Sequence, residues 1–167
     1  MNKGQTEIDL QHNLMQLLRE NLEDMTVEVE TEDGTEKRPV TVYEQHIPYV
    51  TSDEEVRKLY PGVVVRLLTS DRANFTQPRV QRVGIYIGVY DEGLDPSVPH
   101  QWLWVIAHQF QFLFETRRAI GNFVLQKPPM VVEPEEVSYP VYAIGMELSF
   151  EMPSATVPTG KTFERMV

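Results

Sequence analysis

Histidines, paired carboxylates and serines are the side chains of this sequence that could carry metal or catalytic chemistry. No two of the four histidines have the i, i+4 spacing that presents two imidazoles to one metal ion, and no third ligand stands near them in sequence; they are His12, His46, His100 and His108. We therefore expect no metal site. The histidines are interpreted as solvated residues or as residues at the edge of the core.

Acidic pairs occur at three places, and glycoside hydrolysis needs two carboxylates that flank a cleft. The pairs are Asp91-Glu92, Glu135-Glu136, and Glu147 with Glu151. Glu147 and Glu151 lie on the polar face of a predicted strand, so a solvated sheet face explains them better than catalysis. No serine lies in a Gly-x-Ser-x-Gly elbow, and no glycine-rich segment has the strand–loop–helix context of a phosphate loop. The sequence therefore predicts no enzyme and no cofactor.

Composition excludes several further classes of protein. The 167 residues contain no cysteine, which excludes disulfides, thiolate nucleophiles and cysteine-bound metals. No apolar run approaches the roughly 20 residues that cross a bilayer, and the polar first residues do not resemble a secretory signal. With 25 acidic and 15 basic residues, the net charge is −10. Because phosphate neutralisation needs clustered lysine and arginine, we expect no general or sequence-specific binding of nucleic acid.

Arginines gather where the acidic charge is weakest. Residues 61–130 hold five acidic and seven basic residues, whereas both flanking segments are acidic. Four arginines lie in or beside the polar segment 69–78, namely Arg66, Arg72, Arg79 and Arg82. These arginines either pair with local acids such as Asp71 or form a patch that contacts an acidic partner or a neighbouring subunit.

A helix and a hairpin are predicted for the N-terminal part of the chain. Apolar residues at a 3.6-residue period indicate an amphipathic helix over Thr6–Met25. The alternation of Val27–Thr31, the Asp33-Gly34 turn and the segment Pro39–Tyr43 indicate a β-hairpin. Its solvent side is heavily charged, which favours a hairpin that projects. The residues that follow, up to 62, are predicted to be a connection with room for one short helical turn.

The rest of the chain is predicted to supply the sheet and a second helix. The apolar strands Val63–Leu68 and Val80–Tyr90 are joined by a loop too short for a crossover helix, so they pair antiparallel. An aromatic-rich helix is predicted over Val98–Ala119, a short edge strand at Met130–Val132 and a last strand over Tyr142–Phe150. The core stripe of the second helix is predicted to be Trp102, Val105, Ile106, Phe110, Leu113 and Phe114.

Together these elements predict the fold class and the domain organisation. Residues 1–152 are expected to form a single α+β domain, with a mainly antiparallel sheet and two helices packed on one face. The β-hairpin projects from this domain, and residues 153–167 form an extended C-terminal tail. Tyrosines of the strands suit either sheet packing or a subunit interface, where tyrosine is enriched; they are Tyr86, Tyr90 and Tyr142.

The order of elements and two strand motifs resemble those of the tail terminators, small tail-completion proteins of tailed bacteriophages and prophages. An amphipathic first helix precedes the strand Val63–Leu68, and the strand ending Ile85–Asp91 leads into a long helix. The closing segment Tyr139–Glu151 places Tyr-Pro before a Gly-Met-Glu-Leu-x-Phe strand. The resemblance covers about residues 6–152 and includes no catalytic signature.

This resemblance implies a homo-oligomeric ring, usually a hexamer, in the tail or neck of a virion. Such a ring caps the growing tail tube, stops its polymerisation and presents a surface to the head connector. Its partners would be tail-tube protein and head-connector proteins, and DNA would only pass through the ring. Assembly would take place in the cytoplasm of the bacterial host. The acidic surface would suit a conduit in which DNA must not stick.

Ring formation is heterologous, so one edge of a subunit must meet a different edge of the next. A candidate contact joins the basic loop (Arg72, Arg79 and Arg82) to the acidic hairpin (Asp33 and Glu36). Charge reversal at Arg72 and Arg79 is then expected to weaken the oligomer. Two alternatives stay open: another neck component, such as a head–tail connector or a head-closure protein, and an α+β domain that binds a small ligand.

Overall fold

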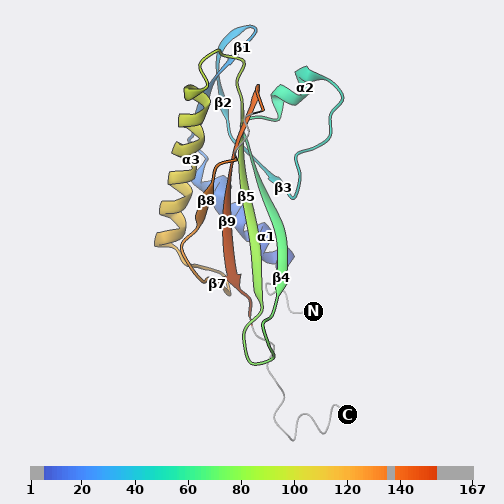
Figure 1. The fold of residues 1–167 in the computed structure, drawn as a ribbon, viewed down its shortest axis with the longest axis vertical. Coiled ribbons are helices and arrows are strands. Elements are labelled where there is room, and N and C mark those ends of the chain that lie inside the picture. Colours follow the sequence, from blue (N-terminus) through green and yellow to red (C-terminus); the bar gives the residue numbers. More distant parts are fainter. Residues whose placement is uncertain (1–5, 135–137, 154–167) are drawn as a thin grey trace, which may run out of the picture.

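The structure is a computed structural model that describes residues 6–134 and 138–153. Its elements in chain order are α1 (Glu7–Asn21), β1 (Thr26–Thr31), β2 (Gly34–Pro39), β3 (Thr41–Glu44), α2 (Asp53–Lys58), β4 (Gly62–Asp71), β5 (Val80–Tyr90), α3 (Ser97–Thr116), β6 (Ala119–Ile120), β7 (Phe123–Leu125), β8 (Met130–Val132) and β9 (Val141–Glu151). Figure 1 shows the long strands β4, β5 and β9 and the helix α3 running along the longest axis of the molecule.

A mixed seven-stranded sheet forms the centre of the fold. Its strands follow the order β3-β4-β5-β9-β7-β6, and β8 pairs with a further part of β9. Only β3 and β4 are parallel among these pairs. The strands β1 and β2 form a separate antiparallel hairpin. This arrangement confirms the predicted α+β fold with a mainly antiparallel sheet and a separate hairpin.

Helix α1 forms because its leucines repeat at the helical period. Leu10, Leu14 and Leu18 are fully buried on one side of the helix. A capping box fixes the first turn: the Asp9 backbone N–H donates to Thr6 Oγ1 at 3.2 Å, and the Thr6 backbone N–H donates to Asp9 Oδ2 at 3.0 Å. The helix packs against β3, β4 and β6.

Helix α3 covers β5 and β9 on the same face of the sheet. Its inner side carries Ile106, Phe110 and Phe114, all fully buried. The strand residues that meet these side chains alternate along β5 and β9, as Ile85 and Ile144 illustrate, at 0% and 1% exposure. Both large helices therefore lie on one face, as predicted, and the main hydrophobic core fills the space between them and the sheet.

The predicted core stripe of α3 is wrong at Val105, whose side chain is 49% exposed. The buried arc of the helix instead includes Leu103, Ala107, Phe110 and Phe114. Val105 lies outside this arc, on the side of the helix that faces away from the sheet. The aromatic content of the helix concealed this division, because apolar residues occupy both sides.

Pro39–Tyr43 does not form the returning strand of the hairpin. The hairpin returns over β2, and Pro39 pairs with Thr26 at its last position. Proline has no backbone N–H to continue a ladder, so the hairpin ends there. The chain then enters the main sheet as β3, whose first residue, Thr41, pairs with Gly62 of β4.

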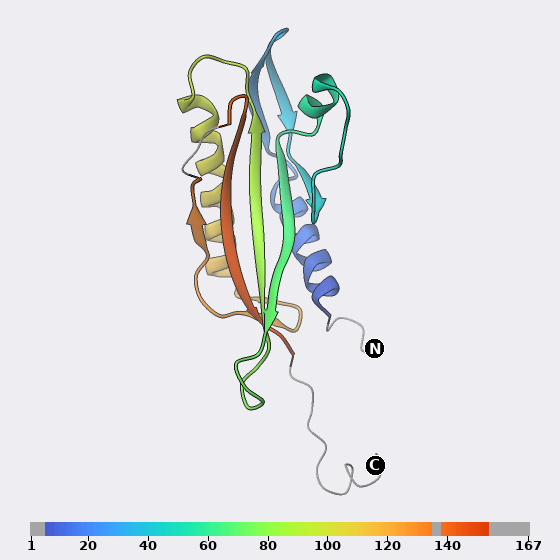
Figure 2. The same cartoon turned by 45° about the vertical axis from the view of Figure 1, so that its right-hand side comes forward.

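The hairpin extends beyond one end of the main sheet (Figures 1 and 2). The inner side of β1 nevertheless packs into the core, because Val27 and Val29 are 0% and 2% exposed. The opposite side carries the charged residues. The predicted C-terminal tail begins at Pro153, and its remainder, residues 154–167, lies outside the described residues.

Two further differences concern short or irregular strands. Strand β4 runs on to Asp71 through an irregularity between Leu67 and Ser70, so it includes the start of the predicted polar loop. The strands β6 and β7, two and three residues long, form a small hairpin that adds to the edge of β9. Segments this short carry too few residues for a periodic signal.

Candidate functional site

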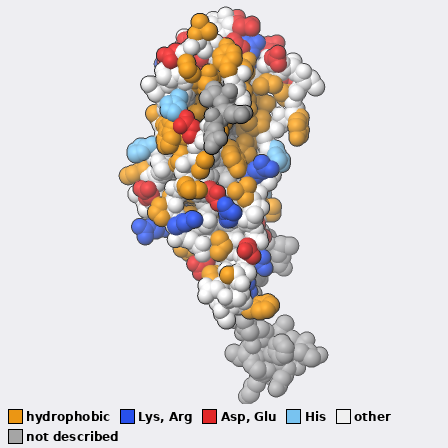
Figure 3. Space-filling view, in the orientation of Figure 1, with side chains coloured by type: hydrophobic (Ala, Val, Ile, Leu, Met, Phe, Trp, Pro, Cys, Tyr) orange, Lys and Arg blue, Asp and Glu red, His pale blue; other side chains and the backbone are white. Residues whose placement is uncertain are grey.

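The face of the sheet turned away from the helices is the candidate functional site, and we call it the open face. Figure 3 looks onto this face and shows apolar side chains gathered over the strands. Its exposed apolar residues come from three strands: Leu68 of β4, Tyr86 of β5, and Met130 and Val132 of β8, at 38%, 39%, 54% and 49% exposure. A monomer rarely leaves apolar residues grouped in this way without a binding role.

A hollow of about 390 Å³ lies in the middle of the open face. Most of its lining is apolar and comes from Leu68, Tyr86, Val132, Pro134 and Met146. We call it the open-face groove. The groove therefore has the character of a packing surface for apolar side chains rather than of a site that orients a polar substrate.

Glycines on neighbouring strands let the Tyr86 ring lie close to the backbone. A Cβ atom on Gly84 would approach the Tyr86 ring to 2.7 Å, and one on Gly145, directly opposite Tyr86, would approach it to 3.5 Å. The tyrosine therefore forms a flat, amphipathic floor for the groove instead of standing upright. At Gly88, further along β5, the ring of Tyr60 occupies the space that a side chain would take.

An ion pair and an exposed arginine, Arg66 of β4, border the groove. Arg82 of β5 forms an ion pair with Glu147 of β9 across the sheet, at one end of the groove. At the other end, the segment around α2 covers the strands, and the Tyr60 ring lies 6.5 Å from that of Tyr90. The apolar middle of the open face is thus bounded by a neutral ion pair and by a packed aromatic pair.

A second exposed apolar surface lies on the opposite side of the molecule, on the outer side of α3. Val98, Val105 and Phe112 repeat every seven residues and are 39%, 49% and 65% exposed, and Trp104, at 37%, lies about 100° around the helix from Val105. Because α3 packs on the covered face of the sheet, this outer stripe and the open face point in opposite directions. We call these four residues the α3 stripe.

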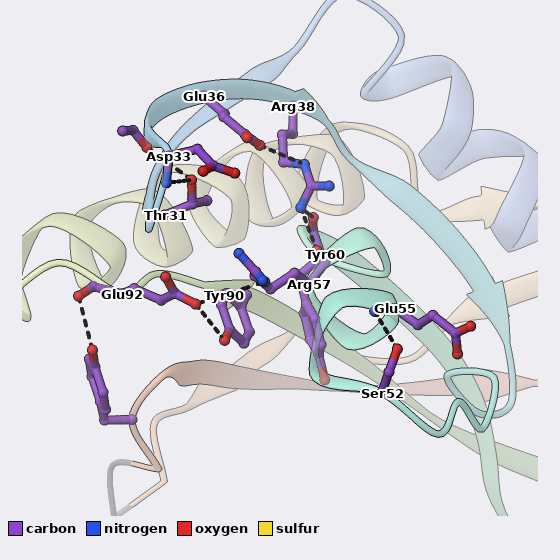
Figure 4. A network of polar contacts seen from close by, with 12 residues as sticks. Thr31, Asp33, Glu36, Arg38, Ser52, Glu55, Arg57, Tyr60, Tyr90 and Glu92 are labelled. Atoms are coloured by element: carbon purple, nitrogen blue, oxygen red, sulfur yellow. Dashed lines mark hydrogen bonds and ion pairs between the residues drawn. The ribbon is translucent and has the colours of Figure 1, made fainter.

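A polar network anchors the hairpin to the body of the protein (Figure 4). The Arg38 guanidinium donates to the backbone carbonyls of Arg57 and Tyr60, and Arg57 Nε lies 3.9 Å from Glu92 Oε1. The Tyr90 hydroxyl donates to the same Glu92 oxygen at 2.8 Å. These contacts link the hairpin, α2 and the end of β5 into one unit.

Asp91, which precedes Glu92 in the acidic pair Asp91-Glu92, is 1% exposed and also helps to hold the hairpin. Its Oδ2 accepts from the Glu30 backbone N–H at 3.2 Å, and its Oδ1 accepts from that of Gly93 at 2.8 Å. Both carboxylates of the pair Asp91-Glu92 are therefore engaged in holding the base of the hairpin against β5. They do not face each other across a cleft, which is the arrangement that glycoside hydrolysis requires.

The titration of Tyr90 should make the free energy of unfolding depend on pH. Burial, followed by the hydrogen bond to Glu92, raises the pKa of the Tyr90 phenol from 10.0 to about 12. Between these values the folded protein keeps a proton that the unfolded chain loses. The free energy of unfolding should therefore be insensitive to this group below about pH 10 and should fall as the pH rises toward 12.

Urea denaturation between pH 8 and 12 measures this dependence. Tyr90→Phe should give a shallower alkaline loss of stability than the wild type, while Tyr49→Phe, at a 99% exposed tyrosine, should leave the slope unchanged. Equal slopes for the wild type and Tyr90→Phe would show that Tyr90 does not keep its proton in this range.

Residues predicted from the sequence to form a contact between neighbouring subunits lie at opposite ends of one subunit. Asp33 and Glu36 belong to the hairpin end, whereas Arg72 and Arg79 belong to the loop between β4 and β5 at the other end (Figure 1). Arg82 lies apart from both, in its ion pair on the sheet. The structure therefore brings Arg72 and Arg79 into one loop and keeps them away from the hairpin of the same chain.

The loop arginines also form hydrogen bonds within the β4–β5 loop. Arg72 Nε donates to the Gln77 carbonyl at 2.7 Å, and the Arg72 backbone N–H donates to Asp71 Oδ1 at 2.7 Å. Arg79 makes a longer contact of 3.4 Å from Nη1 to Ser70 Oγ. At the hairpin, Glu36 Oε2 lies 3.6 Å from Arg38 Nε. Arg79 is thus the loop arginine whose replacement disturbs the local structure least.

Two of the four histidines take part in pairwise contacts at the surface. His12 Nε2 lies 2.8 Å from Glu44 Oε1, and His100 Nδ1 lies 2.8 Å from Glu133 Oε1. Within residues 6–134 and 138–153, no group of three or more acidic or histidine side chains could hold a metal ion. The helices of that part of the chain include none that is long and apolar enough to cross a membrane.

No family model matches the chain, and a search of curated proteins gives no significant match.

Proposed function

We propose that this protein is a structural virion-assembly protein of the tail-terminator kind, whose ring caps a bacteriophage tail tube and joins it to the head connector. The observation that supports self-assembly most strongly is the apolar open face, with Leu68, Tyr86 and Val132 around a hollow of about 390 Å³. The identity of the assembly rests on the resemblance of the element order and of the closing Tyr-Pro strand. The proposal assigns no catalytic residue, metal or cofactor.

An open apolar sheet face favours association because its burial removes apolar surface from water, at roughly 25 cal/mol per Å². The long strands of the face provide a surface that a neighbouring subunit can cover. Tyrosine is well suited to such an interface, since its ring is apolar and its hydroxyl tolerates water. The chain has a net charge of −10, so two copies repel each other. Because Arg82 neutralises Glu147, this part of the open face adds little to that repulsion.

The two charged ends fit contacts with other components of the virion. In a ring whose subunits pack side by side through their faces, the hairpin end and the loop end lie on the two rims of the ring. Asp33 and Glu36 would then face one neighbouring component, and Arg72 and Arg79 the other. This assigns the charged residues to partner contacts rather than to the contact between subunits.

Charge reversal at Arg79 tests that assignment. Arg79→Glu should leave the mass of the homo-oligomer unchanged and weaken, by about tenfold at low salt, the binding of the one partner that the loop meets, tail-tube protein or head connector. The control is Lys58→Glu, which makes the same change in charge on the exposed part of α2. Dissociation of the ring by Arg79→Glu alone would show that the basic loop closes the ring.

Small-ligand binding is a second candidate function, because the volume of the groove falls within the range of ligand pockets, about 300–1,000 Å³. Light scattering coupled to size exclusion separates the two candidates. A ring-forming protein gives a ring-sized species alone or on adding tail-tube protein. A ligand-binding domain stays monomeric under both conditions. Binding of the head connector without the tail tube would point to another component of the neck.

A further inference from the structure

The outer side of α3 is the apolar surface that best fits the open-face groove of a neighbouring copy. We propose that the α3 stripe of one subunit packs into the open-face groove of the next, with Phe112 and Trp104 as its aromatic anchors. This inference rests on the proposed function, which requires contact between copies but does not name the two surfaces. It identifies the occupant of the groove as a helix of the same chain.

Charge favours this occupant. Residues 97–116 contain Glu115 as their only residue among aspartate, glutamate, lysine and arginine, in a chain that carries 25 acidic and 15 basic residues. Glu147, which lines the groove, is paired with Arg82, and the exposed Arg66 of β4 lies beside the groove on the same face. The charge-poor outer side of α3 therefore adds no like-charge repulsion when it packs there.

Helix α3 and strand β9 are of similar length, and the groove lies over the middle of β9. Helix α3 has 20 residues and is about 30 Å long, and β9 has 11 residues and is about 36 Å long. The four residues of the α3 stripe span most of the helix. The aromatic ring of Phe112, 65% exposed, is the side chain of the stripe that has most to gain from burial in the hollow over Tyr86.

Each copy covers one face of its sheet with α1 and α3 and leaves the other face open, an arrangement that antiparallel sheets commonly adopt. A helix of a neighbouring copy could pack on that open face as α3 packs on the covered one. The inner side of α3 already packs on β5 and β9 in this way. The outer side would do the same on the strands of the next copy.

The geometry of the two surfaces dictates a heterologous contact. The α3 stripe and the groove lie on opposite sides of one subunit, so they cannot meet within it. Each copy offers one of each surface, and repeating the contact produces a ring when the rotation closes. A two-fold dimer would instead bring two helices, or two grooves, together.

Charged variants of two phenylalanines test the interface. Phe112→Asp should weaken the subunit contact at least tenfold, because a carboxylate would enter the apolar groove. The control is Phe75→Asp, the same substitution at a 91% exposed phenylalanine of the β4–β5 loop, which should leave the oligomer intact. Circular dichroism and urea denaturation verify that both variants fold. An oligomer that survives Phe112→Asp overturns the inference.

Cross-linking identifies the two surfaces directly, because the chain has no natural cysteine. In the full chain, Leu68→Cys combined with Phe112→Cys should give a ladder of covalent oligomers with a short bismaleimide reagent. Neither single variant should do so. A covalent dimer of Phe112→Cys alone would overturn the inference by showing that helix pairs with helix.

The two proposals fail in different ways. A wild-type ring without any cross-link between positions 68 and 112 would reject the interface and leave the proposed function standing. A wild type that stays monomeric at every concentration, with and without tail-tube protein, would reject both.

Discussion

Replacing Phe110 with alanine is expected to cost about 3–5 kcal/mol of the free energy of unfolding, the largest effect on stability that we predict for one side chain. Phe110 is fully buried on the inner side of α3, where the helix meets β5 and β9. Its loss removes the transfer free energy of an aromatic ring and leaves a cavity among side chains that cannot collapse fully. Urea denaturation at neutral pH and low protein concentration measures the difference.

Phe112→Ala is the matched control, since it makes the same substitution two residues further along the same helix. Phe112 is 65% exposed, and its truncation should change the stability of the monomer by less than about 0.5 kcal/mol. Together the two variants test the division of α3 into an inner and an outer side. A large loss for Phe112→Ala and a small one for Phe110→Ala would mean that the helix is rotated from the position described.

Tyr86→Asp is expected to have the largest effect on assembly. The tyrosine is the floor of the open-face groove, and loss of an aromatic anchor at the centre of an interface typically costs 2 kcal/mol or more, about 30-fold in affinity. The buried carboxylate that replaces it adds a desolvation cost. We therefore expect a monomer at concentrations where the wild type is oligomeric, as measured by analytical ultracentrifugation.

Tyr49→Asp serves as the control for this prediction. Tyr49 is 99% exposed in the connection before α2, away from the groove, and its replacement should leave the oligomer unchanged. Retention of the wild-type oligomer by Tyr86→Asp would show that the open face does not take part in assembly. Loss of the oligomer in both variants would point to a general effect of added acidic charge.

Periodicity predicted the long elements well, because each of them buries one side in a single core. The alternation of β5 and β9 placed Ile85 and Ile144 on the covered face, and the spacing of the leucines placed α1. Short elements escaped prediction: β6 and β7 contain two and three residues, and β3 follows the hairpin so closely that its sequence was taken as part of it.

The candidate site was only partly predictable. Tyr86 was recognised as a residue for sheet packing or for an interface. The exposed position of Val105 was hidden, because an aromatic-rich helix has apolar residues on both sides, whereas Phe112 was left out of the predicted core stripe. The groove itself depends on residues from β4, β5, β8 and β9, whose proximity follows from strand order. The sequence alone also could not place Asp33 and Arg72 at opposite ends.

The most direct test of self-assembly is light scattering coupled to size exclusion on the full chain, over a range of protein concentration and salt, with and without tail-tube protein. We expect a closed species with a mass close to six times the 19.3 kDa of one chain, formed alone or on the tube protein. A species of 19.3 kDa under every one of these conditions would contradict it.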